Sequence, residues 1–158
     1  MINFYEDFVV GEENVLGSYA FTREAIIAYA RAYDPQPFHL DDAAGAASIY
    51  GSLCASGWHT ACVCMRVLID WRDARRKEAE ARGEDVPTLG VSPGVRDVRW
   101  PNPVRPGDVV TFYSKVESMR ETKRPAWGLI GNHTRGVDHN GREVLSMHSH
   151  VFVARRGM

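Results

Sequence analysis

Residues 57–71, which read GWHTACVCMRVLIDW, decide the fold. A helix formed by this stretch would carry apolar side chains on nearly every face, and a helix that is apolar on all sides is a buried one. The stretch is too short, and too interrupted by Arg66, to cross a membrane. We therefore expect a central buried helix with a sheet wrapped around it. Its apolar residues are Ala61, Cys62, Val63, Cys64, Met65, Val67, Leu68 and Ile69.

Beyond this stretch the sequence becomes abruptly polar, from Asp70 to Arg82, with Trp71 as the exception. We interpret the polar part as a solvent-exposed continuation of the same helix, in preference to a phosphate-binding patch. A loop is expected over residues 83–93. The charged residues of the continuation are Arg72, Asp73, Arg75, Arg76, Lys77, Glu78 and Glu80.

A first strand and two helices are expected before the central helix. Residues 14–21 read as the strand, and residues 23–33 read as a helix with Thr22 as its N-cap. A second short helix is expected from Asp41-Asp42 to about Ile49, because acidic side chains are favoured at the positive N-terminal end of a helix.

Four strands are expected after the central helix, at residues 95–100, 108–118, 127–137 and 143–154. In the second of them Val110, Phe112 and Val116 alternate with polar residues. Asn140-Gly141 is a signal for a two-residue hairpin turn. Early helices followed by antiparallel strands predict an α+β fold, with one sheet curled around one helix in a single domain over residues 1–158.

The composition is that of an ordinary globular domain. The chain has 158 residues, of which 44% are hydrophobic and 25% are charged, and a net charge of −1. This charge gives no reason to expect a nucleic acid or an anionic membrane as a partner. The N-terminus lacks a basic region followed by a long apolar run, so we expect no signal peptide and a cytoplasmic location.

Cysteines and histidines do not form a recognisable metal-binding pattern. Cys54, Cys62 and Cys64 lie in apolar surroundings and are interpreted as small buried thiols in a reducing compartment. His148 and His150 lie on one face of an expected strand and His133 on another strand, but no acid or cysteine nearby in the sequence completes a set. No nucleotide-binding loop and no serine-hydrolase elbow is present either.

A second informative stretch, YDPQPFHLD at residues 33–41, places Asp34 and His39 on a chain that contains two prolines. Each proline keeps the residue before it out of the helical region, so Asp34 and Gln36 should be extended within a rigid loop. Imidazole titrates near neutrality, and a carboxylate can orient it or relay a proton. The pair is therefore a candidate acid/base couple; the alternative is a turn-capping Asp34 and a packed or exposed His39.

Three segments, in this order, resemble the MaoC-like dehydratases, the (R)-specific enoyl-CoA hydratase group of the hot-dog fold. DPQPFH at residues 34–39 resembles the family's Asp-x-Asn-Pro-x-His segment, and ASGW at residues 55–58 resembles its His-Gly-Met turn. RWPNPVRPGD at residues 99–108 resembles its later Phe-x-x-Pro-Val-x-x-Gly-Asp segment. Gln36 stands where many members carry Asn, and Ser56 where many carry His.

This resemblance implies a hydratase or dehydratase that acts on an acyl thioester such as an acyl-CoA, without metal or organic cofactor, and as a homodimer or larger homo-oligomer. Asp34 and His39 would be catalytic. Gly57 would bind the thioester oxygen at the start of the central helix, where backbone N–H groups lack partners and the helix dipole is positive. Ser56, Gln36 and Trp58 would line the substrate site. The structural alternative is that Ser56 is an N-cap and Gly57 allows tight packing.

Two other functions stay open. A hot-dog thioesterase hydrolyses thioesters with a single carboxylate, whereas this sequence pairs Asp34 with His39. A non-catalytic acyl-thioester-binding protein is the second alternative, and it rests on the departures at Gln36 and Ser56. His59, next to Trp58, is interpreted as a hydrogen-bonded polar residue at the edge of the pocket.

Overall fold

A computed structural model describes residues 4–88 and 90–157. Residues 1–3, part of the N-terminal segment considered above, lie outside the described residues, as do residues 89 and 158. The elements are a short 3-10 helix η1 (Tyr5–Asp7), strand β1 (Glu13–Ala20), helices α1 (Arg23–Tyr33), α2 (Pro37–Leu40), α3 (Asp42–Ala47) and α4 (Gly57–Ala81), and strands β2 (Gly94–Arg99), β3 (Val109–Glu121), β4 (Trp127–Asp138) and β5 (Glu143–Ala154).

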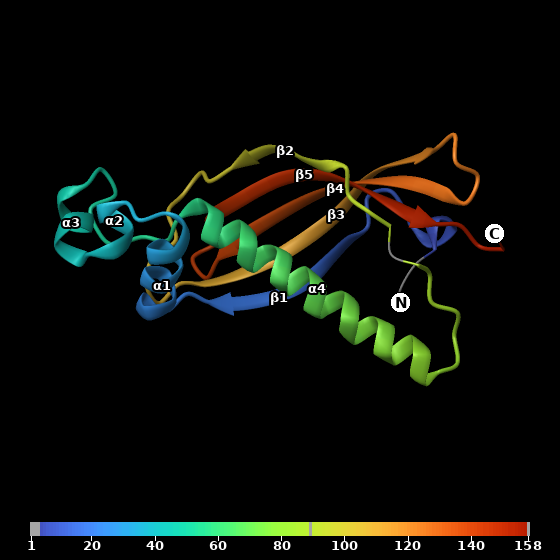
Figure 1. The fold of residues 1–158 in the computed structure, drawn as a ribbon, viewed down its shortest axis with the longest axis horizontal. Coiled ribbons are helices and arrows are strands. Elements are labelled where there is room, and N and C mark those ends of the chain that lie inside the picture. The colour runs from blue at the N-terminus through green and yellow to red at the C-terminus, as the bar shows by residue number, and fades with distance from the viewer. Residues whose placement is uncertain (1–3, 89, 158) are drawn as a thin grey trace.

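One antiparallel sheet carries the fold, with the strand order β1-β3-β4-β5-β2. Helix α4 crosses one face of this sheet diagonally, and α1, α2 and α3 gather at the end where α4 begins (Figure 1). The described chain ends lie at the opposite end of the sheet. The expected α+β architecture, one sheet curled around one central helix, is therefore confirmed.

The core lies between α4, α1 and the concave face of the sheet. Phe21, Ile26, Phe112 and Leu145 are completely buried there and pack around Cys64 of α4. Strand β3 shows the expected alternation, because Val110, Phe112 and Val116 are buried while the residues between them are partly or fully exposed. A smaller cluster forms at the other end of the sheet around Tyr5, Val116, Ile130 and Val153.

Helix α4 is continuous over 25 residues, as the sequence predicted. One sheet covers only one side of a helix, however, so part of the apolar stretch is exposed in the single chain. Trp58 is 56% exposed, Met65 48% and Ile69 36%, and Cys62 lies on the same face. The expectation of a helix buried on every side is therefore met only on the side that faces the sheet.

The polar continuation of α4 also differs from its expected solvent-exposed character. Arg72 and Arg75 are half-buried, and both line a cavity between the helix and the sheet. The cause is that the helix stays close to the sheet beyond its apolar part, so one side of the polar segment still faces inward. A sequence pattern of mixed charges does not show which arginines point that way.

Three local expectations need correction. His39 lies in the single helical turn α2, which begins at Pro37, and not in a loop; proline is favoured at the first position of a helix because it needs no N–H partner there. Helix α3 ends at Ala47, two residues before the expected Ile49. The β4–β5 hairpin has a three-residue loop, closed by the Asp138–Arg142 pair, with Gly141 at φ 80°.

Two of the three cysteines are buried thiols, as expected. Cys54 and Cys64 are buried, and burial raises the pKa of Cys64 to about 12. Cys62 is exposed, so the expectation was wrong for this residue, and its sulfur lies 3.4 Å from the Tyr29 hydroxyl.

His59 lies in the first turn of α4 and is buried in the core. Its ring stacks on Tyr29 with centroids 4.5 Å apart and meets the edge of Phe21 at 5.1 Å. The side chain is 5% exposed, and its Nδ1 atom has no hydrogen-bond partner among the described residues. The expectation of a hydrogen-bonded residue at the pocket edge was therefore wrong. Burial disfavours the charged imidazolium and lowers the pKa of His59 to about 4.

This burial predicts an acid-sensitive fold. Between about pH 6.5 and about pH 4 the unfolded chain binds a proton at His59 that the folded chain does not. Stability should therefore be complete above pH 6.5 and fall as the pH drops through this window, by about 3 kcal/mol at most.

Urea unfolding at fixed protein concentration, at about pH 7.5 and about pH 4.5, would measure this difference. His59→Phe should keep the stacking and flatten the pH dependence, whereas the exposed-site control His139→Gln should leave it unchanged. An equal loss of stability in the wild type and in His59→Phe would contradict the assignment.

Candidate functional site

A cavity of about 440 Å³ lies at the N-terminal end of α4, between α2 and the segment that precedes β3. This volume is in the usual range for small-molecule sites. The structure brings to its wall all six residues that the sequence singled out, although they come from two separate segments of the chain. They are Asp34, Gln36, His39, Ser56, Gly57 and Trp58.

Asp34 and His39 are placed by the end of one helix and the single turn of the next. The Asp34 backbone N–H closes α1 on the Ala30 carbonyl at 2.9 Å, and Asp34 then leaves the helical region with φ −150° and ψ 69°. Gln36 is extended, as expected from the following proline, and Pro37 starts α2. This path brings His39 Nε2 to 3.5 Å from Asp34 Oδ2.

The other nitrogen of the His39 ring determines its protonation pattern. Nδ1 lies 2.7 Å from the backbone carbonyl oxygen of Cys54, and a carbonyl only accepts hydrogen bonds. The neutral ring therefore carries its proton on Nδ1, and Nε2 presents a lone pair toward the cavity. His39 is 5% exposed, so its orientation is also fixed by packing. An unprotonated Nε2 at a cavity wall can accept a proton from a bound molecule.

Asp34 is held in its ionised form. The side-chain amide of Gln36 donates to Asp34 Oδ1 at 2.9 Å. Hydrogen bonds from Gln36 and from Ser56, and the proximity of His39, outweigh the effect of burial and lower the pKa of Asp34 below its ordinary value. At neutral pH Asp34 is thus a carboxylate with one oxygen bound to Gln36 and the other directed at His39 Nε2.

The first turn of α4 forms another wall. Ser56 is buried and caps the helix, because its Oγ accepts the Trp58 backbone N–H at 3.2 Å, as the sequence predicted. The Gly57 N–H makes no backbone hydrogen bond to a described residue. A polar atom of a substrate placed at this end would meet unpartnered N–H groups and the positive end of the helix dipole.

Gly57 also packs against an indole ring, so both readings of this glycine have structural support. A Cβ atom at position 57 would lie 2.5 Å from Cδ2 of Trp100, far inside van der Waals contact. Trp100 in turn meets Trp58 edge to face, with ring centroids 5.1 Å apart. The two indoles stand at the cavity wall and narrow the approach to the Gly57 amide.

Three backbone contacts hold the three sequence segments together at the site. The Cys54 carbonyl binds the His39 ring, and the Cys54 N–H donates to the Phe38 carbonyl at 3.3 Å. The next residue, Ala55, donates its N–H to the Val104 carbonyl at 2.8 Å. Hydrogen bonds therefore connect the first segment to the second, and the second to the third.

Sequence reasoning missed two contributors to the site. Cys54 acts through its backbone carbonyl, which no side-chain pattern reveals. Trp100 lies in the third of the family-like segments, RWPNPVRPGD. Because the other two segments were already expected to line the site, membership of this set was the signal that could have placed Trp100 at the cavity.

The histidines of the strands lie outside this cavity. The rings of His133 and His148 stack at 4.8 Å, and His148 Nδ1 lies 2.8 Å from a Glu117 oxygen, an acidic neighbour that the sequence did not suggest. Among residues 4–88 and 90–157, no three His, Cys, Asp or Glu side chains are grouped so as to hold a metal ion.

Comparison with known proteins agrees with this architecture. Five antiparallel strands around one long helix define the chain as a hot-dog protein. Residues 9–136 match the family model described as the MaoC like domain, so the chain belongs to that family. A MaoC-like dehydratase from Rhodospirillum rubrum superposes with a TM-score of 0.82 and 32% sequence identity, over 99% of both chains.

More distant relatives carry informative names. A mesaconyl-CoA hydratase from Cereibacter sphaeroides is 33% identical over 78 residues, which are 47% of this chain and 23% of that protein. The chain thus matches less than a quarter of the length of this relative. An (R)-hydratase from A. caviae involved in PHA biosynthesis shares the fold, with a TM-score of 0.67 and 22% identity over 92% of this chain and 97% of that one.

One further property concerns membranes. Within the part of the chain that the structure describes, none of the helices combines the length and the apolar character needed to span a bilayer.

The hydrogen bond to Cys54 predicts the tautomer of His39. Neutral His39 should carry its proton on Nδ1, and proton–nitrogen correlation NMR distinguishes this tautomer from the Nε2–H form. The half-exposed His139 provides a comparison within the same spectrum. A neutral His39 with its proton on Nε2 would contradict the geometry described here.

Proposed function

We propose that this protein adds or removes water across the Cα–Cβ bond of an acyl thioester, an enoyl-CoA or 3-hydroxyacyl-CoA. The observation that carries the proposal is the His39–Asp34 pair, in which the imidazole Nε2 and an ionised carboxylate lie 3.5 Å apart at the wall of one cavity. Membership of the MaoC-like family supports it, and so do the hydratase names of the relatives.

In the hydration direction the two residues act on one water molecule. His39 Nε2 takes a proton from the water as its oxygen attacks Cβ, and the imidazolium that forms is stabilised by the Cys54 carbonyl and by Asp34. Asp34 orients the water and relays the proton to Cα. Because the thioester itself acidifies Cα, the reaction needs no metal or organic cofactor.

The start of α4 would stabilise the charge that develops on the thioester oxygen. In the proposed mechanism the Gly57 N–H donates to this oxygen as it becomes enolate-like, aided by the helix dipole. Trp58 and Trp100 would flank the thioester and keep bulk water from the reacting atoms. Gln36 would hold Asp34 in place, and Ser56 would keep the helix end intact.

Acyl-thioester hydrolysis is the second candidate, and the geometry favours hydration. Hydrolysis needs one carboxylate to activate water and no group that delivers a proton to Cα. The fixed tautomer of His39 gives the site a separate base, which such a hydrolysis would leave without a role. A non-catalytic acyl-thioester-binding protein would not need the His39 ring and the Asp34 carboxylate to face each other.

One assay separates these three functions. A panel of enoyl-CoA substrates would be followed both for loss of the enoyl absorbance and for release of free thiol. Loss of absorbance without thiol is expected. Release of thiol would identify a thioesterase, and binding without either change would identify a non-catalytic protein.

We also propose that the protein is a homodimer. The exposed stripe of Trp58, Met65 and Ile69 on α4 and the open edges of β1 and β2 are surfaces that a second copy would cover.

Sedimentation of dilute protein should give a dimer. Met65→Glu should shift the equilibrium toward monomer, because it places a charge in the apolar stripe. The control Arg66→Gln, at the neighbouring exposed position, should leave the dimer unchanged. A protein that stays monomeric at all concentrations tested would contradict the proposed dimer.

The acid/base pair is tested by substitution. Asp34→Asn and His39→Ala should each lower kcat by at least ~100-fold, because each removes a group that handles the same proton. The double mutant should cost much less than the product of the single effects.

Since His39 is buried in α2 rather than exposed in a loop, His39→Gln serves as a second variant that better preserves packing. Folding of each variant would be checked by thermal unfolding. Near-normal turnover in any folded single variant would refute the assignment.

The backbone contact at the helix start is tested by comparing two neighbouring positions. Ser56→Ala should be comparatively mild, with a loss of about 1 kcal/mol through the weakened cap, because Asp34 loses its hydrogen bond from Ser56 but keeps the one from Gln36. Gly57→Val should nearly abolish turnover, because the branched side chain would crowd the approach to the backbone N–H, and losing one oxyanion donor typically costs about 3 kcal/mol in the transition state.

Gly57→Val also collides with Trp100, so the double variant Gly57→Val/Trp100→Ala and the single Trp100→Ala are the matched controls. The double variant should regain stability but not turnover. An inactive Ser56→Ala beside an active Gly57→Val would place the contact on the serine hydroxyl instead.

A further inference from the structure

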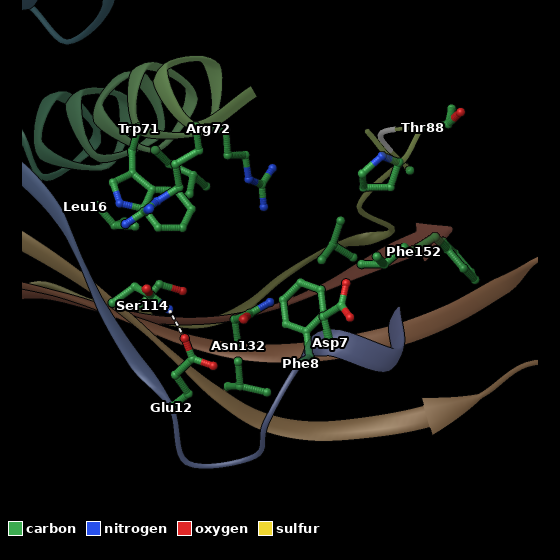
Figure 2. A pocket seen from close by; sticks show the side chains of 18 residues that line it. Asp7, Phe8, Glu12, Leu16, Trp71, Arg72, Thr88, Ser114, Asn132 and Phe152 are labelled. Atoms are coloured by element: carbon green, nitrogen blue, oxygen red, sulfur yellow. Dashed lines mark hydrogen bonds between the residues drawn. The ribbon is translucent and has the colours of Figure 1, made fainter. Parts of the chain in front are cut away.

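A second cavity, of about 420 Å³, lies between the C-terminal half of α4 and the concave face of the sheet. Figure 2 shows Trp71 and Arg72 reaching from α4 toward the sheet, with Ser114 and Asn132 on the opposite side. The two cavities share no lining residue. Arg72 follows Gly57 by fifteen positions, which is about 22 Å along the helix, so this cavity is separate from the Asp34–His39 site.

Arg72 is the unusual residue of this cavity. It is half-buried and makes no hydrogen bond or ion pair with another described residue, whereas Arg66 on the same helix is paired with Asp70. Burial lowers the pKa of Arg72, yet a guanidinium remains charged at neutral pH. Its guanidinium is partly withdrawn from water and has no ion-pair partner among the described residues, so it is available to bind an anion.

The acidic residues at the cavity wall do not supply that anion. Asp7 is already bound to Arg156, with its carboxylate 2.6 Å from the guanidinium. Glu12 is exposed, and its carboxylate accepts a hydrogen bond from the side-chain amide of Asn14 at 3.3 Å. Neither carboxylate lies within ion-pair distance of Arg72.

Two further groups add to the polar end of the cavity. Arg75 lies over the Trp71 ring at 4.2 Å, and its Nε atom has no hydrogen-bond partner among the described residues. Asn132 is half-buried on the side of β4 that faces the helix, and its side-chain amide makes no hydrogen bond to a described residue. A fully buried donor without a partner, such as Arg75 Nε, is rare in folded proteins, and a ligand could satisfy it together with the accessible amide of Asn132.

Apart from the polar residues Asn14, Thr88 and Ser114, the rest of the wall is apolar. Its side chains come from the helix, the sheet and the segment after η1, and they surround the polar groups with hydrocarbon and aromatic rings. They include Phe8, Leu16, Leu68, Val116, Val151 and Phe152.

We propose that this cavity binds a small amphipathic carboxylate, whose head group pairs with Arg72 and whose hydrocarbon tail lies along the apolar wall. A planar carboxylate matches the two parallel N–H donors of a guanidinium. A phosphate would bring more negative charge close to Glu12 and Asp7 and would leave the apolar wall uncovered. Asn132 donates to the second carboxylate oxygen or to water beside it.

Calorimetric titration of the full chain with octanoate tests this proposal. Octanoate should bind, octanol should bind about 10-fold or more weakly, and inorganic phosphate should not compete. Arg72→Gln should weaken octanoate binding by about 10-fold or more, and Arg72→Lys should have an intermediate effect because it keeps the charge but not the planar donors. The matched control Arg66→Gln, on the exposed side of the same helix, should bind normally.

Fluorescence locates the bound octanoate. Trp71 lines this cavity, whereas Trp58 and Trp100 line the other, so Trp71→Phe should abolish the octanoate-induced change and Trp100→Phe should retain it. Absence of octanoate binding, or equal binding by a folded Arg72→Gln, would overturn the proposal.

Two other outcomes would overturn it as well. Loss of binding in His39→Ala or Trp100→Phe would place octanoate in the candidate catalytic cavity. If the wild type does not bind octanoate and Arg72→Gln changes the sedimentation coefficient, this face instead contacts a second copy of the chain. None of these outcomes depends on whether the protein turns over enoyl-CoA.

Discussion

The hydrogen bond between the His39 ring and the Cys54 carbonyl is the contact on which the rest of the candidate site depends. It satisfies a buried carbonyl, which would otherwise cost free energy, and it thereby joins α2 to the turn that starts α4. The same contact places the ring proton on Nδ1 and leaves Nε2 facing Asp34. One short interaction between residues fifteen positions apart thus joins two walls of the cavity and orients the His39 ring.

Much of the fold could be predicted because it follows from local rules. The boundaries of α1 and β5 match the expected ones, since Thr22 caps the helix and the Asn140-Gly141 turn signal precedes the strand. The single turn α2 was missed because Pro37 was read as a residue that stops helices, whereas it can also start one. The approach of Asp34 to His39 was expected from their spacing, but the distance depends on how α1 and α2 meet, which only the folded chain shows.

What the sequence could not show are contacts between distant segments. Trp100 covers Gly57 because the segment after β2 returns to the start of α4, and no periodicity encodes that return. The burial of Arg72 has a similar cause: the inclination of α4 against the sheet decides which arginines of a charged stretch face inward. Helix α4 consequently forms a wall of two cavities with different characters. Its capped N-terminal end contributes backbone N–H groups, and its C-terminal half contributes guanidinium groups.

The close contact between Gly57 and Trp100 has a consequence for the evolution of this protein. A side chain of any size at position 57 would occupy the space of the indole ring, so neither position can change freely without the other. Substitutions at the two positions should therefore arise as compensating pairs, with a larger residue at 57 accompanied by a smaller one at 100. Trp100 directly follows the edge strand β2. Substitutions at the end of this strand and at the start of α4 should therefore evolve together.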